Sequence, residues 1–268
     1  MFSRVLVPTD GSQLATEALR VGERLAQRWD CELHVLTLIE PGQIESGIRH
    51  IIGRQVAAIE TRPKVDIRPM SAGIAEDISA EFDRIDDTLI VMGTWGRGRS
   101  AGLVPNNAEQ VLRLMRSPMI ALGTGVGIRA DWPSGPMLIA VDGSQFGEAV
   151  VQPAARLAEA LGVGLRLITV IDADGSQGGQ PAEANSLAEL ARMVESMTGR
   201  RVAHEVVKGH DPSRAIADCG RRYDASLIAM STHGRSGFDR LASDSEAMDV
   251  VRHAGCPVFL HRPPVAED

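Results

Sequence analysis

The chain has 268 residues, of which 44% are hydrophobic and 24% are charged, and its formal net charge at pH 7 is −7. This length is enough for two domains with substantial cores. The acidic balance argues against a sequence-independent nucleic-acid binder and against a protein that binds anionic membrane surfaces, because both need a basic face. Only Lys64 and Lys208 are lysines, and no Gly-x-x-x-x-Gly-Lys-Ser/Thr run that would form a P-loop occurs.

The apolar runs of the chain are short. The first, at residues 5–8, is too short for a signal peptide, and no later run approaches the length that spans a membrane. The three cysteines are widely separated and show no spacing typical of a metal site. We therefore expect a cytoplasmic protein without a membrane or nucleic-acid partner and without a metal site built from its own side chains.

Strands and helices alternate along the first half of the chain. Short apolar runs predict strands at 5–8, 33–39, 65–70, 89–92 and 119–122. Amphipathic spacing predicts helices at 14–28, 48–60 and 74–85, and a fourth helix that begins after the loop following residue 92. This alternation predicts an α/β domain in which a parallel sheet has right-handed crossovers and helices on both faces.

The second half of the chain repeats the first. Asp10-Gly11-Ser12 recurs 132 residues later as Asp142-Gly143-Ser144, and the apolar run 89–92 recurs 138 residues later as 227–230. A register that shifts so little indicates a duplicated domain. We predict a first domain at 1–125, a linker rich in glycine and proline at 126–136, and a second domain at 137–268.

A glycine-rich loop follows the fourth predicted strand in each half. In the first half, residues 93–98 read Gly-Thr-Trp-Gly-Arg-Gly, and in the second half residues 231–237 read Ser-Thr-His-Gly-Arg-Ser-Gly. Each loop leads toward a helix N-terminus, and the free backbone amides of such a unit can hold an anion. In open parallel sheets, ligands bind at the carboxyl ends of strands where the strand order reverses, so we expect both loops at such crevices.

Taken together, these motifs resemble those of the universal stress protein family. The resemblance rests on a first strand ending in Asp-Gly-Ser, on the loops after the fourth strand, and on a last strand introduced by Ser-Pro or Cys-Pro. It covers nearly the whole chain as two tandem copies. It implies, in each copy, a doubly wound five-stranded parallel sheet of Rossmann-like type, with strand order 3-2-1-4-5, as in the adenine nucleotide alpha hydrolases. Many members of the family bind ATP through the pattern Gly, two residues, Gly, nine residues, Gly-Ser/Thr.

The resemblance, with the strand-end geometry, points to a set of nucleotide-binding positions. In the first copy they are Thr9, Asp10, Gly93, Gly96, Arg97, Gly98, Asn106 and Asn107, and in the second copy Asp142, Ser231, Gly234, Arg235 and Ser245. The acids Asp10 and Asp142 either contact adenine or ribose, or only cap the following helix, and both roles stay open. Either Pro105-Asn106 or Asn106-Asn107 stands in place of Gly-Ser. Asparagine tolerates a left-handed backbone, and its amide can donate to a phosphate oxygen.

The second copy departs further from the family pattern, because Asp244-Ser245 stands where Gly-Ser is expected. A carboxylate about 4 Å from a phosphate is repelled by about 4 kcal/mol at an effective dielectric constant near 20. The helix dipole returns only about 0.3 to 1 kcal/mol. Ser243 and Glu246 instead form a capping box that suits an empty helix N-terminus. We therefore expect a degenerate second site and place the candidate site for ATP, with Mg²⁺, in the first copy.

Our interpretation is a tandem universal stress protein with a non-enzymatic role, because no paired acid and base identifies a catalytic centre. Ser100 matches a nucleophile elbow only formally, since it lies past the strand end and no histidine follows it in the first domain. A structural or partner-binding module with both pockets closed is the main alternative, and a slow ATPase is the third. The resemblance also implies an intramolecular pseudo-dimer through strands 119–122 and 258–260, and it is compatible with a homodimer.

Overall fold

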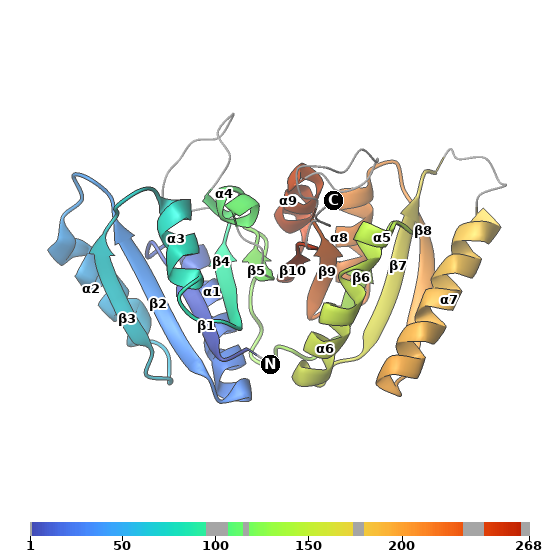
Figure 1. The fold of residues 1–268 in the computed structure, drawn as a ribbon, viewed down its shortest axis with the longest axis horizontal. Helices are drawn as coiled ribbons and strands as arrows, with labels where there is room; N and C mark the ends of the chain where they lie inside the picture. Colours follow the sequence, from blue (N-terminus) through green and yellow to red (C-terminus); the bar gives the residue numbers. More distant parts are fainter. Residues whose placement is uncertain (1, 95–106, 115–117, 174–179, 233–243, 264–268) are drawn as a thin grey trace. The chain divides into compact units, whose positions relative to one another are not determined.

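The computed structural model describes residues 2–94, 107–114, 118–173, 180–232 and 244–263. The chain divides into two compact units, Met1–Ile128 and Arg129–Asp268, and Figure 1 shows the elements of each. The segment predicted as a linker, 126–136, spans this division. Within the second unit, the Arg129 guanidinium lies 2.9 Å from the Asp224 carboxylate, and the Trp132 indole N–H donates to the Ser226 carbonyl at 2.8 Å. Much of the predicted linker therefore packs onto the second unit.

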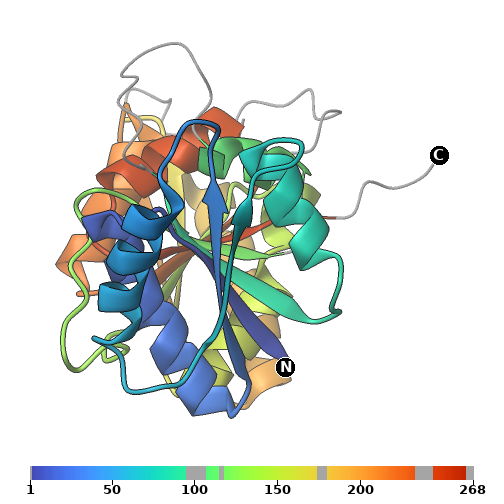
Figure 2. The same cartoon turned by 90° about the vertical axis from the view of Figure 1, so that its left-hand side faces the viewer.

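The first unit is a five-stranded sheet in which neighbouring strands are parallel. Its elements are β1 (Arg4–Pro8), α1 (Gln13–Trp29), β2 (Glu32–Ile39), α2 (Glu45–Val56), β3 (Lys64–Pro69), α3 (Ile74–Phe82), β4 (Thr88–Gly93), α4 (Asn107–Leu114) and β5 (Met119–Leu122). The strand order is β3-β2-β1-β4-β5, as predicted. Helices α1 and α2 cover one face of the sheet and α3 and α4 the other (Figure 1), and Figure 2 shows α2 and α3 on opposite sides of β2 and β3.

The second unit repeats this plan. Its elements are β6 (Met137–Ala140), α5 (Gln145–Glu148), α6 (Val151–Leu161), β7 (Leu165–Ile171), α7 (Gln180–Thr198), β8 (Val202–Lys208), α8 (Pro212–Arg222), β9 (Leu227–Ser231), α9 (Asp244–His253) and β10 (Val258–His261). The strand order is β8-β7-β6-β9-β10, again with parallel neighbours. Helices α5 and α6 together occupy the place of the single helix α1. Pro153 explains the break, because its ring cannot follow the carbonyl of Ala149 in a continuous helix.

Burial on both faces explains why the central strands read as unbroken apolar runs. In β1, Val5, Leu6 and Val7 are fully buried. The prediction for α2 was wrong at its end, because the helix stops at Val56 and not at residue 60. The backbone amides of Glu60 and Thr61 donate to the carboxylate of Glu23 on α1, at 2.5 and 2.9 Å. Between the helix and these residues, the amides of Ala58 and Ile59 donate to carbonyls three residues back, so the chain has already left the α-helical pattern before it reaches Glu23.

An ion network is buried beneath α3 in the first unit. Arg4 is only 1% exposed, and it donates to the Glu81 carboxylate at 3.2 Å and to Thr88 Oγ1 at 3.0 Å. His34 Nδ1 lies 3.3 Å from Arg4 Nη1. Since arginine only donates, Nδ1 accepts and the neutral ring carries its proton on Nε2. Burial lowers the pKa of His34, although the charge of Glu81 opposes this shift.

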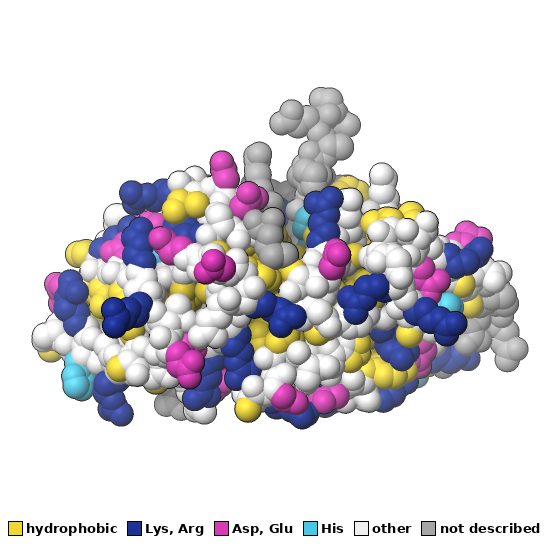
Figure 3. Space-filling view, turned by 90° about the horizontal axis from the view of Figure 1, so that it is seen from below, with side chains coloured by type: hydrophobic (Ala, Val, Ile, Leu, Met, Phe, Trp, Pro, Cys, Tyr) yellow, Lys and Arg dark blue, Asp and Glu magenta, His cyan; other side chains and the backbone are white. Residues whose placement is uncertain are grey.

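The surface carries charges of both signs. On the face shown in Figure 3, dark blue Lys and Arg side chains are interspersed with magenta Asp and Glu side chains. Among the helices that the structure describes, none combines the length and the apolar character needed to cross a lipid bilayer.

Candidate functional site

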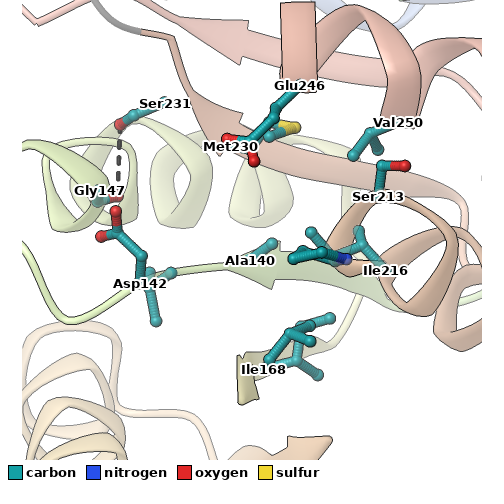
Figure 4. A pocket seen from close by; sticks show the side chains of 13 residues that line it. Ala140, Asp142, Gly147, Ile168, Ser213, Ile216, Met230, Ser231, Glu246 and Val250 are labelled. Carbon is teal, nitrogen blue, oxygen red and sulfur yellow. Dashed lines mark hydrogen bonds between the residues drawn. The ribbon is translucent and has the colours of Figure 1, made fainter. Parts of the chain in front are cut away.

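A pocket with a volume of about 60 Å³ opens at the carboxyl end of the sheet in the second unit. Strand β6 pairs there with β7 on one side and with β9 on the other, so the strand order reverses at this point. Figure 4 shows Asp142, Gly147 and Ser231 at one end of the pocket, and Ser213, Ile216 and Val250 at the other. Space for one water molecule takes only about 10–15 Å³, so the pocket accommodates a larger group.

The acid that follows β6 is fixed by a tight turn. Oδ1 of Asp142 accepts from the Ser144 amide at 2.9 Å and from the Ser144 hydroxyl at 2.6 Å. The hydroxyl oxygen of Ser144 accepts in turn from the Gly147 amide at 2.9 Å and caps α5. A Cβ atom at residue 147 would lie 1.9 Å from Asp142 Oδ1. Glycine at this position therefore lets the carboxylate fold back over the helix start.

The first unit forms the same turn, but its aspartate is more exposed to solvent. Oδ1 of Asp10 accepts from the Ser12 amide at 2.9 Å, and the Ser12 hydroxyl accepts from the Ala15 amide at 3.2 Å. Ala15 occupies the position of Gly147, 132 residues earlier. Asp10 is exposed, whereas Asp142 is half-buried. In both units the serine is the helix cap, and the aspartate is not.

Two further predicted residues of the first unit support the fold locally. Thr9 is buried, and its hydroxyl donates to Gln55 Oε1 at 3.0 Å while it accepts from the Gly11 amide at 3.2 Å. Gly93 ends β4, and a Cβ atom there would lie 2.8 Å from Cγ of Leu14 on α1. Glycine at residue 93 therefore avoids a close contact with the Leu14 side chain of α1.

Several predicted site residues lie outside the described residues. They are Gly96, Arg97, Gly98 and Asn106 in the first unit, and Gly234 and Arg235 in the second. Asn107 is the first residue of α4, and Ser245 is the second residue of α9. Ser231, in contrast, lines the pocket, and its hydroxyl donates to the Gly147 carbonyl at 3.3 Å.

The burial pattern of the last helix fixes how the two copies correspond. The residues of α4 and α9 with no more than 1% exposure include Ala108, Val111 and Leu112 in the first unit and Ala247, Val250 and Val251 in the second. These two sets match with an offset of 139. This offset places Pro105-Asn106 opposite Asp244-Ser245, and it places Asn107 opposite Glu246.

Glu246 is the charged pocket residue that sequence reasoning missed. The capping-box pattern explained this residue without a ligand, whereas the structure places it in the lining with Val250 one helical turn later. Ser213 and Ile216 enter the lining from the first turns of α8. Glu246 and Val250 are four residues apart and Ser213 and Ile216 are three apart, so each pair lies on one helix face near the helix start. This spacing was the only signal in the sequence that these residues share a surface.

The described residues include two cysteines that are buried and free, Cys219 and Cys256. Burial raises the pKa of both thiols, and that of Cys256 rises to about 12. A thiol with such a pKa stays protonated at neutral pH and is a poor nucleophile. In the described part of the chain, no group of three or more His, Cys, Asp or Glu residues is arranged to hold a metal ion.

The universal stress protein family model matches residues 1–55 and 134–262. Universal stress protein Rv1996 of Mycobacterium tuberculosis is 24% identical, over 97% of this chain and 95% of that protein. Universal stress protein Rv2005c of the same species is 26% identical, but the match spans 65% of this chain and only 61% of that protein. The crystal structure of a universal stress protein from Archaeoglobus fulgidus is 21% identical, with a TM-score of 0.65 over 98% of this chain and 97% of that chain. This structural similarity extends over both units and agrees with the predicted fold.

Proposed function

The chain belongs to the universal stress protein family, and from this premise we propose that it is a stress-response protein whose first unit binds an adenine nucleotide. One observation carries the proposal. The second unit forms a pocket with Asp142 and Ser231 at one end, at the strand ends that correspond to Asp10 and Gly93 in the first unit. The offset between α4 and α9 gives the first unit the neutral Asn107 where the second unit has the carboxylate of Glu246.

This difference in charge supports a nucleotide in the first unit over one in the second. A carboxylate at the helix start would repel a phosphate by about 4 kcal/mol at 4 Å and an effective dielectric constant near 20. An asparagine amide donates to phosphate oxygens instead. The positive end of the α4 dipole, at the helix N-terminus, would also attract the phosphates. Arg97 of the glycine loop would pair with the phosphates, and Mg²⁺ would accompany ATP.

At the other end of the nucleotide, Asp10 would accept a hydrogen bond from adenine or ribose. Its Oδ1 already accepts from the Ser12 amide, and the side chain is exposed at the end of β1. A carboxylate held by a turn is preorganised, so little side-chain entropy is lost on binding.

Titration calorimetry of the full-length chain with ATP, with and without Mg²⁺, tests the proposal. We expect saturable binding with a Kd below about 1 mM, equivalent to more than about 4 kcal/mol. Asp10→Ala should weaken this binding about tenfold, since a hydrogen bond to a charged group contributes about 1.5 to 3 kcal/mol. Asp86→Ala is the matched control, because Asp86 is exposed on the loop before β4.

A Kd weaker than about 1 mM for the unaltered chain would refute the proposal and favour a partner-binding module without nucleotide. Mass spectrometry of small molecules extracted from freshly purified protein gives an independent answer. Release of phosphate that Asp10→Ala abolishes would instead favour slow ATP hydrolysis.

A further inference from the structure

The polar side chains that line the pocket of the second unit can accept hydrogen bonds from a ligand but have few hydrogen-bond donors available. The hydroxyl of Ser213 donates to Asp211 Oδ1 at 2.7 Å, and the hydroxyl of Ser231 donates to the Gly147 carbonyl. Carboxylates and carbonyls only accept, so both hydroxyl protons are already used. Each serine therefore presents only lone pairs to a ligand.

The two charged side chains of the lining carry the same sign. They are the carboxylates of Asp142 and Glu246, and the described lining contains no Lys, Arg or His side chain. Two carboxylates at one pocket raise the local concentration of cations and repel anions. A phosphorylated ligand is therefore disfavoured in the pocket of the second unit.

The remainder of the lining is apolar and comes from several elements. Ala140 and Ile168 lie at the ends of β6 and β7, Met230 near the end of β9, Ile216 on α8 and Val250 on α9. In Figure 4, Ile216 and Val250 lie with Ser213 at the end of the pocket opposite Asp142 and Ser231, and Ala140, Met230 and Glu246 lie between the two ends. A ligand with an apolar body and a polar head would match this division.

We propose that this pocket binds a small organic cation that carries a primary or secondary ammonium group on an apolar body. The ammonium group donates to Asp142 and to the lone pairs of Ser231, in the field of Glu246. The apolar body lies over Ala140 and Ile216 toward Val250. Ammonium groups have donors and no acceptor, which complements what these side chains offer.

Three probes of similar shape and different charge test this assignment on the full-length chain. They are 2-phenylethylamine, 2-phenylethanol and phenylacetate, each titrated by calorimetry at pH 7 and low salt. We expect the amine to bind roughly tenfold or more tightly than the alcohol, because a hydrogen bond to a charged group is stronger than a neutral one. Phenylacetate should show no saturable binding.

Isosteric variants locate the amine. Asp142→Asn keeps an oxygen that can accept from the Ser144 amide, and Glu246→Gln keeps the length of the side chain. The double variant should lower the affinity for 2-phenylethylamine roughly tenfold, to about that of the alcohol. Asp249→Asn is the matched control, because Asp249 lies on the same helix, pairs with Arg252 and is absent from the lining.

Three results would overturn the proposal. They are no saturable binding of the amine, binding of phenylacetate as tight as that of the amine, or an unchanged amine affinity in the double variant. The comparison of probes uses the unaltered chain, so it stands even if a variant is poorly folded. Amine binding that persists in Asp10→Ala separates this site from the proposed nucleotide site, whose failure would leave the present proposal untouched.

Discussion

The strand ends of the two units share one backbone design and differ in the charge of the residues next to them. In each unit the acid after the first strand accepts from the amide of a capping serine, at 2.9 Å, and a glycine with positive φ lies between them. The helix after the fourth strand begins with Asn107 in one unit and presents Glu246 to the pocket in the other. On the two proposals made above, the strand ends would set where a ligand binds, and the residue at the helix start would set which charge that ligand carries.

The units also differ in how they arrange their ion pairs. The first buries Arg4 and Glu81 beneath α3, with side-chain exposures of 1% and 4%. In the second, Glu205 accepts from Tyr223 and pairs with Arg222 at 2.8 Å, with its own side chain 30% exposed. We therefore expect the two units to respond differently to loss of a charge.

The largest effect is expected for Glu81→Gln. Removing one partner of a buried pair leaves Arg4 uncompensated and costs about 3–5 kcal/mol of unfolding free energy. Glu205→Gln in the second unit should cost about 1 kcal/mol or less, because solvent reaches and screens this partly exposed pair. Urea unfolding of both full-length variants measures the difference, and equal losses would contradict this contrast between the units.

Transplanting the charge tests the contrast between the crevices. Asn107→Glu should make the first unit resemble the second and weaken ATP binding roughly tenfold, once screening by salt is taken into account. Asn107→Gln is the neutral control and should bind ATP almost as well as the unaltered chain. Calorimetric titration at two salt concentrations measures the effect, which should be smaller at high salt. If the glutamate variant binds ATP normally, Asn107 does not face the phosphates.

Acid should weaken the first unit through the buried network. Burial lowers the pKa of His34, so below pH 6.5 the unfolded chain binds this proton more readily than the folded unit does. Burial raises the pKa of Glu81, but the hydrogen bond from Arg68 and nearby positive charges outweigh burial and lower it. The stability that each group contributes is complete above its unfolded pKa, 6.5 or 4.5, and is lost as the pH falls through the folded value.

His34→Asn isolates the histidine part of this dependence. Between pH 7 and pH 5.5 the unaltered chain should lose about 1 kcal/mol of stability, within the limit of about 1.4 kcal/mol per pH unit for one proton. The variant should show a flatter dependence in this range. His50→Asn, at an exposed position on α2, should keep the slope of the unaltered chain. Urea unfolding at a series of pH values measures these slopes. Parallel curves of unfolding free energy against pH for His34→Asn and the unaltered chain would contradict the prediction.

The smallest effect is expected for Gly147→Ala, which gives the second unit the alanine of the first. The new Cβ atom would displace the Asp142 carboxylate, so 2-phenylethylamine should bind roughly threefold more weakly as this charge-assisted hydrogen bond is distorted. The unfolding free energy should change by less than about 1 kcal/mol, because alanine favours a helix over glycine by about that amount and so offsets part of the cost of the displaced carboxylate. Ala15→Gly is the reciprocal variant and should leave amine binding unchanged. Calorimetry with the amine measures both variants.

The sequence predicted the fold more completely than the candidate site. Buried strands appear as apolar runs, and the Asp-Gly-Ser repeat locates the strand ends because its turn is entirely local. The end of α2 was mispredicted: the backbone turns to i, i−3 bonds at Ala58 and Ile59, and Glu60 then donates to Glu23 of another helix. The inward position of Asp142 could not be predicted from the sequence either. It depends on the space left at residue 147, where a Cβ atom would lie 1.9 Å from the Asp142 carboxylate.

Glu246 lies on the first turn of α9, outside every strand of its sheet. Substitutions there alter the charge of the crevice without altering the apolar residues that drive folding. After a gene duplication, one copy can therefore acquire a new ligand preference through single codon changes, while selection for folding continues to preserve its strands.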